Sequence, residues 1–415
     1  MKRKFSFLVL VSSLLLLFSS CKDRVDEYDL RLNFEGRYLG EQSWVLVQSP
    51  DFNETYDFVE ITGRTSYELN DVGSYKVNIT LANKRTSLSG KASYFLQTFY
   101  NIPAREWYIK GDFRSMKAAG STQVKVTTNL EGSYNLRLST RFQTKIELAN
   151  AKDYLFTQFP VSDLDENDKV NFLALGWNET EKTGFFEWLI DQDFKSYTGA
   201  EAYPISATKP IVSSNIVSQI PISYVRIDSY SKALYGAVYN HYQKEFDVAQ
   251  TSFPVFFAGL PQGKTQNYFV TVGSYPSSNL NVHRHYTGNS VPANVNIGNI
   301  SISANYNAQA REIENIRTSG TLSYFLTNWV ASNSSADYYW EFSVPRHFKS
   351  FQFPNIPTNL FNAIKASPQD FKPLDIIHVS TESFRNLEDY YRSWFGRTGY
   401  YFPYTVIDEA ELKFE

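Results

Sequence analysis

An alternation of apolar and polar residues with a period of two constrains this chain more than any other feature. It is clearest in GSYKVNITL (73–81), GSYNLRLST (132–140) and ADYYWEFSV (336–344). In the last stretch, aromatic or aliphatic residues stand at positions 338, 340, 342 and 344. Because successive side chains of a strand point to opposite faces, this pattern predicts half-buried strands of antiparallel sheets.

The length of 415 residues and the 16% of aromatic residues indicate more than one domain. We expect an all-β fold of two or more antiparallel β-sandwich (Ig/transthyretin-like) domains with a few short helices. One short helix is expected near 185–189. Another is expected over 380–395, with Ser380 or Thr381 as its cap. A proline-rich stretch, 203–223, predicts an extended connector.

The N-terminus reads MKRKFSFLVLVSSLLLLFSSCKD. A basic start (Lys2–Lys4) precedes an apolar run (Phe5–Phe18) that is too short to span a bilayer, which is typical of a secretory signal peptide. Cys21 is the only cysteine, so it cannot form a disulfide within the chain. One interpretation is ordinary cleavage near Ser20, which leaves Cys21 without a role.

The other interpretation is lipidation, because LFSSC resembles the lipobox of bacterial lipoproteins, with Phe18 where leucine is usual. The resemblance implies that Cys21 becomes the acylated N-terminus and is anchored in outer-membrane lipid. CKDRVDEYD then resembles the export signal of Bacteroidota-type surface lipoproteins. Its matching residues are Lys22, Asp23, Asp26 and Glu27, although Arg24 and Val25 interrupt the acids. The resemblance implies an outer-membrane location facing the cell exterior, and a periplasmic orientation stays open.

These features divide the chain into expected segments. They are a lipoprotein signal peptide (1–20), an acidic surface tether (21–34), an N-terminal β-sandwich domain (35–150), an irregular and partly helical connector (151–220) and a C-terminal β-rich domain (221–415). YELNDVGSYKVNI also resembles the closing strands of the carboxypeptidase regulatory-like domain, although a spacer is missing before Gly73. That resemblance implies a small β-sandwich near 35–82.

The charge of the chain argues against nucleic acid as a partner. The formal net charge is -3, and loss of Lys2, Arg3 and Lys4 with the signal peptide changes it from -3 to -6. Binding to nucleic acid requires a basic field, which this composition does not provide.

The stretch AGLPQGKT (258–265) matches a loose phosphate-loop pattern. A phosphate loop follows a buried strand and opens a helix, whose N-terminal amides hold the phosphates. Here the residues after Thr265 alternate at Tyr268, Val270 and Val272, which predicts a strand. We therefore expect a turn between two antiparallel strands and no nucleotide.

Two groups of residues suggest metal ligands. His283 and His285 share one strand face, but two imidazoles alone do not complete a site. Asp163, Asp165 and Asn167 have the alternate spacing of a calcium loop, but Asp168 stands where that loop needs glycine. A surface strand and a solvated acidic loop are the preferred interpretations, so no metal or other cofactor is expected. No catalytic set is recognised either, and the chain is not expected to be an enzyme.

A C-terminal stretch, DYYRSWFGRTGYYFPY (389–404), is rich in aromatic residues and arginine. Such side chains stack on sugars and anchor protein interfaces, but they also fill β-sheet cores. The candidate ligand or partner contacts are Tyr390, Tyr391, Trp394, Arg397, Tyr400 and Tyr401.

Together these observations predict a non-catalytic surface lipoprotein that binds a ligand, in particular a glycan, as an accessory of a nutrient-uptake system. The alternative is a structural subunit of an outer-membrane barrel complex for transport, secretion or assembly. In that case the aromatic residues would contact a barrel protein.

Overall fold

The computed structural model describes residues 28–35, 41–86, 91–110, 121–128, 134–139, 144–149, 153–160, 169–178, 180–181, 183–193, 203–205, 209–231, 237–260, 267–381, 386–394 and 406–414. The all-β prediction is confirmed, because strands dominate these residues and form five sheets. The two α-helices among them are α2 (Thr358–Ile364) and α3 (Leu387–Trp394), and η2 (Pro368–Asp370) is a short 3-10 helix.

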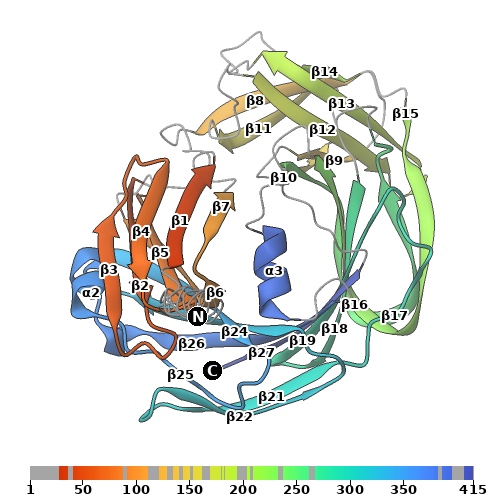
Figure 1. Ribbon diagram of the computed structural model, residues 1–415. Coiled ribbons are helices and arrows are strands. Elements are labelled where there is room, and N and C mark those ends of the chain that lie inside the picture. The colour runs from red at the N-terminus through yellow and green to blue at the C-terminus, as the bar shows by residue number, and fades with distance from the viewer. Residues whose placement is uncertain are drawn as a thin grey trace, which may run out of the picture.

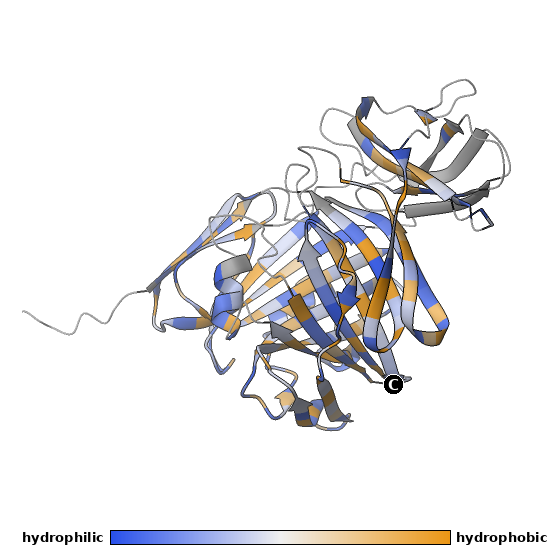
Figure 2. Ribbon diagram, turned by 90° about the vertical axis from the view of Figure 1, so that its right-hand side faces the viewer, coloured by the Kyte–Doolittle hydropathy of each residue, from blue (hydrophilic) through white to orange (hydrophobic). Residues whose placement is uncertain are grey.

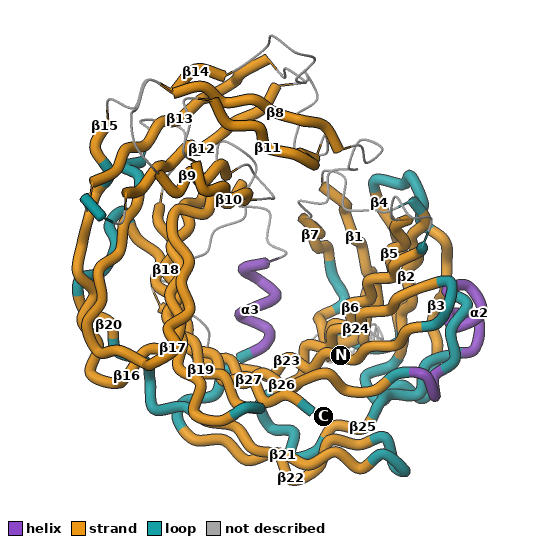
Figure 3. Tube along the Cα trace, turned by 180° about the vertical axis from the view of Figure 1, so that it is seen from behind, coloured by secondary structure: helices purple, strands orange, loops and turns teal. Residues whose placement is uncertain are grey.

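One large sheet contains most of the long strands. Its order is β17 (Ala237–Phe257), β16 (Val212–Ser231), β18 (Asn267–Ser277), β19 (Leu280–Gly288), β27 (Val406–Lys413), β26 (Lys372–Thr381), β23 (Tyr324–Ser332), β24 (Ala336–Pro345), β6 (Ala92–Pro103), β5 (Lys76–Thr86), β2 (Gln42–Gln48) and β3 (Thr55–Glu60), with β20 (Asn294–Val295) beside β16. The sheet curves around α3, which lies on its concave side (Figures 1 and 3).

Four smaller sheets complete the fold. They are β4 (Ser66–Val72), β1 (Tyr28–Glu35) and β7 (Glu106–Lys110); β10 (Thr144–Ala149), β9 (Tyr134–Ser139), β12 (Lys169–Asn178), β13 (Thr183–Asp193) and β15 (Lys209–Pro210); β11 (Asp153–Pro160), β8 (Ser121–Thr128) and β14 (Tyr203–Ile205); and β21 (Ser301–Asn307), β22 (Glu312–Ser319) and β25 (Phe351–Gln352).

The large sheet joins strands from both of the β-rich segments that the sequence suggested as separate domains. The junction is the parallel pair β24–β6. Across it the rings of Tyr94 and Tyr338 stack with centroids 5.1 Å apart. The indole nitrogen of Trp340 also donates to Thr98 Oγ1 over 2.8 Å. The two segments therefore share one sheet and one buried core.

The predicted alternation is confirmed in β24, where positions 338, 340, 342 and 344 are buried and Tyr339 is exposed. Figure 2 shows the same alternation of hydrophobic and hydrophilic residues along other strands of the large sheet. It fails in β5, whose polar Asn78 and Thr80 are buried as well. Both faces of β5 are covered, and Asn78 Nδ2 donates to the carbonyl of Ser49 over 2.9 Å.

Three local predictions need correction. The expected tether ends early, because residues from Tyr28 onward form β1, which pairs with β4 and β7. The expected connector contains β11 to β16, and residues 185–189 lie in strand β13 rather than in a helix. Sheet pairing decides both cases, because β1 pairs with strands far along the chain and β13 pairs with its neighbour β12. The C-terminal helix exists, but Ser380 and Thr381 end β26, and Asn386 Oδ1 accepts from Asp389 N–H at the start of α3.

The β16–β17 hairpin folds back on itself. In a straight strand, residues 242 and 254 would lie about 40 Å apart. Instead, the Tyr242 hydroxyl donates to the carbonyl of Pro254 over 3.3 Å, and the rings of Phe246 and Phe253 lie 5.0 Å apart. The two halves of β17 therefore face each other.

The sequence that resembles a phosphate loop follows this folded hairpin. Strand β17 precedes it and strand β18 follows it, as the alternation predicted. The two strands do not pair with each other directly, since both pair with β16. A strand in place of the required helix leaves no helical N-terminus to hold phosphates.

Candidate functional site

A pocket of about 220 Å³ opens on the large sheet where β5, β6, β23 and β24 run side by side. We call it the aromatic pocket. Its lining residues are Asn83, Arg85, Phe95, Leu96, Gln97, Asn328, Trp329, Val330, Tyr339, Trp340, Glu341 and Leu374.

Two stacked rings form the exposed platform of the aromatic pocket. Phe95 and Tyr339 are paired across β6 and β24, and their centroids lie 5.4 Å apart with an interplanar angle of 13°. They remain 37% and 47% exposed, and Leu374 beside them is 43% exposed. The guanidinium carbon of Arg85 lies 5.4 Å from the Phe95 centroid. The platform is therefore largely apolar and open to solvent.

The platform lies on the same face of the sheet as α3. In β6, Phe95, Gln97 and Phe99 point to one side because they alternate along the strand. Phe99 packs edge-on against Tyr391 of α3, with centroids 5.8 Å apart. The aromatic pocket therefore opens on the concave side of the sheet.

Polar groups stand next to the platform on the neighbouring positions of the same face. Gln97 Nε2 donates to Glu341 Oε1 over 3.2 Å, and Asn328 Nδ2 donates to Asp375 Oδ1 over 2.8 Å. Burial raises the pKa of Glu341, and the negative charges of Asp375 and Glu409 raise it further. Burial also raises the pKa of Asp375 to about 6.

This combination of groups suits a polar ligand with one apolar face. A flat ring pair offers stacking area, while amides and a carboxylate offer hydrogen bonds in fixed directions. A sugar ring has this character, with C–H groups on one face and hydroxyls around its edge. No covalent chemistry is required for such binding.

The aromatic residues that the sequence suggested lie elsewhere. Tyr391 is buried, and its hydroxyl donates to the carbonyl of Ser343. Its assignment as a contact residue is wrong because α3 packs that side of the helix onto the sheet. Tyr390 is half-buried, with its ring 4.5 Å from that of Tyr324. Trp394 ends α3, and its side chain is not described.

Arg397, Tyr400 and Tyr401 lie outside the described residues, as do Cys21, Lys22, Asp23, Asp26, Glu27, Asp163, Asp165 and Asn167. The N-terminal interpretation and the calcium candidates therefore stay predictions. Among the described helices, none is long and apolar enough to cross a membrane.

Sequence analysis missed Phe95 and Tyr339 as a site. The two residues stand 244 positions apart, and only the pairing of β6 with β24 brings them together. A local signal existed for Tyr339. It stands on the polar face of an alternating strand, where an aromatic side chain has no core to enter.

His283 and His285 do share one face of β19, with ring centroids 6.2 Å apart. His285 Nε2 lies 3.1 Å from Glu409 Oε2, and its Nδ1 lies 2.9 Å from Thr271 Oγ1. These contacts occupy both ring nitrogens of His285. Within the described part of the chain, no group of three His, Cys, Asp or Glu residues could hold a metal ion.

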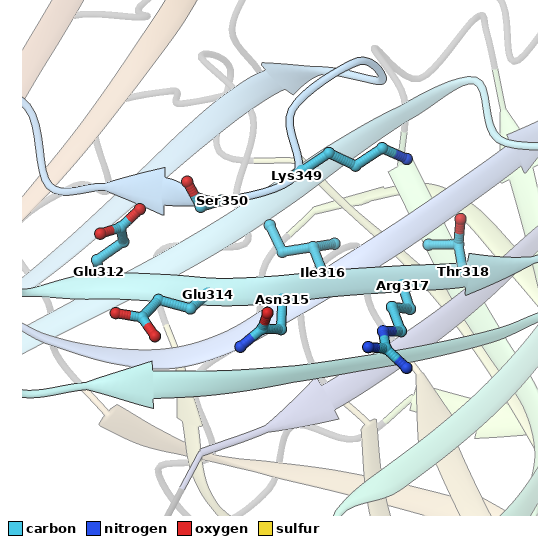
Figure 4. A pocket seen from close by; sticks show the side chains of 8 residues that line it. All are labelled: Glu312, Glu314, Asn315, Ile316, Arg317, Thr318, Lys349 and Ser350. Carbon is cyan, nitrogen blue, oxygen red and sulfur yellow. The ribbon is translucent and has the colours of Figure 1, made fainter.

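A second hollow follows strand β22 and is drawn in Figure 4. Its lining side chains are polar or charged, apart from Ile316, and they come from β22 and from Lys349 and Ser350. In Figure 4 these side chains do not converge on one point. Glu314 already accepts a hydrogen bond of 2.7 Å from Asn307 Nδ2. The hollow therefore lacks the convergent groups of a binding site.

No family model matches this chain, and no curated protein matches it. Among solved structures, a tetra-tandem repeat in the extending region of a large adhesion protein is similar to it, with 9% sequence identity. The match covers 87% of this chain and 96% of that chain, with a TM-score of 0.14. A TM-score this low supports no conclusion about fold or function.

Proposed function

We propose that this protein is a non-catalytic surface lipoprotein that binds a glycan through the aromatic pocket, as an accessory of nutrient uptake at the outer membrane. The observation that carries the proposal is the exposed Phe95–Tyr339 ring pair beside Gln97 and Glu341. The location rests on the N-terminal sequence, namely the signal peptide and the lipobox at Cys21.

The ring pair has a physical reason to serve a ligand. An aromatic side chain that stays in solvent does not gain the free energy of burial. The exposed Phe95–Tyr339 pair can gain it when a partner packs against the two rings. The surrounding amides and the carboxyl group of Glu341 form directional hydrogen bonds, and such bonds distinguish one sugar stereoisomer from another. The pocket of about 220 Å³ accommodates a small part of a longer glycan.

The test is a glycan array probed with the purified full-length chain, followed by calorimetry on the best oligosaccharide. Replacing Tyr339 by alanine removes half of the platform and should weaken binding about tenfold. Tyr75→Ala is the matched control. Tyr75 is 48% exposed, as Tyr339 is 47% exposed, but it does not line the pocket.

The proposal fails if no glycan binds, or if Tyr339→Ala and Tyr75→Ala weaken binding equally. Release of new reducing ends by the unaltered chain, but not by Glu341→Gln, would instead assign glycoside hydrolysis.

A second candidate function, as a subunit docked on an outer-membrane barrel protein, is favoured by a different surface. Val217, Ile220 and Val248 lie near the bend of the folded β16–β17 hairpin and are 43%, 37% and 75% exposed. Exposed apolar groups of this kind suit a protein interface. Affinity purification from solubilised outer membranes should then recover one barrel protein in equal amount. Val248→Asp should abolish that recovery.

A further inference from the structure

A row of polar side chains that contains two acids runs past the platform of the aromatic pocket. Glu341 lines the pocket, is partly exposed, and follows Tyr339 by two positions on the same face of β24. Asn328 of β23 is paired with Glu341 on one side and with Asp375 of β26 on the other. Glu341, Asn328 and Asp375 therefore stand side by side on three neighbouring strands.

Neither of these two acids has a cationic partner. Among the described residues, the carboxyl group of Glu341 accepts from the side-chain amide of Gln97, and that of Asp375 accepts from the side-chain amide of Asn328. No ion pair joins either acid to a described lysine, arginine or histidine. A carboxylate that is largely removed from water without a counter-charge costs free energy.

The basic side chains on the neighbouring strands β19 and β27 contact other acids. His285 Nε2 lies 3.1 Å from Glu409 Oε2, and Lys413 Nζ lies 4.0 Å from Glu411 Oε2. His283 carries a positive charge only when it is protonated, and burial lowers its pKa. These basic groups therefore leave the two acids beside the platform unpaired.

Burial and repulsion between like charges act on both unpaired acids. Burial raises the pKa of Glu341, and the charges of Asp375 and Glu409 raise it further. Burial also raises the pKa of Asp375 to about 6, where the charge of Glu411 acts in the same direction and that of Lys413 opposes it. A positive charge next to Glu341 would favour the ionised form of these acids. A cation is therefore the group that this side of the pocket lacks.

The platform leaves room for a ligand on the side of these acids. Arg85 of β5 lies over the Phe95 ring, and Phe95 of β6 stacks on Tyr339 of β24. Because β6 lies between β5 and β24, Arg85 approaches the ring pair from the side away from Tyr339. The other face of Tyr339 points toward β23, where Val330 is its paired residue. A ring stacked on that face has an edge toward Glu341.

We propose that the glycan of the aromatic pocket carries a free amino group, as in a chain of N-deacetylated hexosamine units, and that Glu341 binds its ammonium group while the sugar ring stacks on Tyr339. Asp375 strengthens the attraction through its negative charge. This inference rests on the proposed glycan binding and adds the chemical class of the ligand. An acetyl group on the same nitrogen removes the positive charge and therefore the attraction.

The test is calorimetry of the purified full-length chain with three β-1,4-linked tetrasaccharides at about pH 6. They are the tetramer of D-glucosamine, its fully N-acetylated form, and cellotetraose. The D-glucosamine tetramer should bind at least tenfold more tightly than either neutral tetramer, because a hydrogen bond between two charged groups is stronger than one between neutral groups. Added sodium chloride should weaken only this preference.

Binding of the D-glucosamine tetramer should also release protons. At about pH 6 a part of the Asp375 population is protonated. The incoming ammonium group favours the ionised acids, so the complex holds fewer protons than the free protein. Calorimetry in two buffers of different ionisation enthalpy measures this release, which the neutral tetramers should not produce.

Glu341→Gln separates the charge of this residue from its shape. Glutamine keeps an oxygen that can accept from Gln97, so the variant should bring the tenfold preference for the D-glucosamine tetramer close to one. Glu312→Gln is the matched control, since Glu312 is also partly exposed but lies on β22 in another sheet. That control should leave the preference unchanged. Circular dichroism of each variant establishes that it is folded.

The outcomes separate this proposal from the first one. Equal affinities for the three tetramers, all weakened by Tyr339→Ala, would overturn the amino-sugar proposal and leave glycan binding in place. No binding of the D-glucosamine tetramer would overturn it as well, and the glycan array then decides separately whether any glycan binds. A preference that Glu341→Gln does not change would also refute it.

Discussion

At the scale of single residues, burial decides the chemistry of the acids on the concave face. Asp375 is 4% exposed, and its pKa is about 6 instead of 3.8. The folded protein therefore holds this proton more tightly than the unfolded chain does. Its stabilising contribution is complete below pH 3.8 and is lost as the pH rises through about 6.

This difference gives a prediction for Asp375→Asn. Between pH 3.8 and pH 7 the unaltered protein should lose about 3 kcal/mol of unfolding free energy that the variant keeps, because the amide does not ionise. Urea unfolding of both proteins at several pH values measures the difference. Asp337→Asn is a control of opposite sign, since a hydrogen bond from Lys91 lowers the pKa of Asp337. Parallel stability curves for Asp375→Asn and the unaltered protein would refute the prediction.

At the scale of elements, α3 shows how a helix is fixed to a curved sheet. Its Tyr391 is buried against Phe99, and its Tyr390 packs on Tyr324. The aromatic richness of 389–404 was compatible with both a core and a contact surface. For Tyr391 the packing of α3 decides in favour of the core.

Tyr391→Ala should therefore cost about 3–5 kcal/mol of unfolding free energy, because it leaves a cavity under α3. Tyr391→Phe keeps the ring and loses only the hydrogen bond to Ser343, so it should cost about 1 kcal/mol or less. Denaturant unfolding of the two variants measures both losses of unfolding free energy. A cost below about 1 kcal/mol for Tyr391→Ala would mean that the residue does not belong to the core.

At the scale of the whole molecule, the large sheet removes the expected boundary between the β-rich segments. β6 lies between β5 and β24, so the strands on its two sides come from opposite ends of the chain. The buried core likewise contains residues from β1 to β27. The N-terminal strands are part of this core rather than an independent unit.

A fragment that contains only residues 35–150 should consequently fail to fold. It would expose the backbone edge of β6 and lose the packing of Tyr94 on Tyr338. It also lacks part of β1. Near-ultraviolet circular dichroism and one-dimensional NMR of the fragment check this. A cooperative thermal transition with dispersed methyl signals would restore the two-domain interpretation.

The sequence by itself determined the local properties of this chain. A period of two predicts strands because it depends only on successive side chains, and the strand after the apparent phosphate loop followed from the same rule. Periodicity does not predict which strand pairs with which. Pairing with β12 made residues 185–189 a strand, contacts with Ser49 and Thr98 accompany the burial of Asn78 and Thr80, and packing of α3 on Phe99 buried Tyr391.

Long-range pairing assembled the candidate site. The aromatic pocket joins Phe95 to Tyr339 because β6 pairs with β24. Strand partners are chosen by the total burial that a sheet achieves, which is a property of the folded chain and not of any segment. Local sequence thus determined which residues form strands, whereas the tertiary structure decided which side chains meet in a pocket.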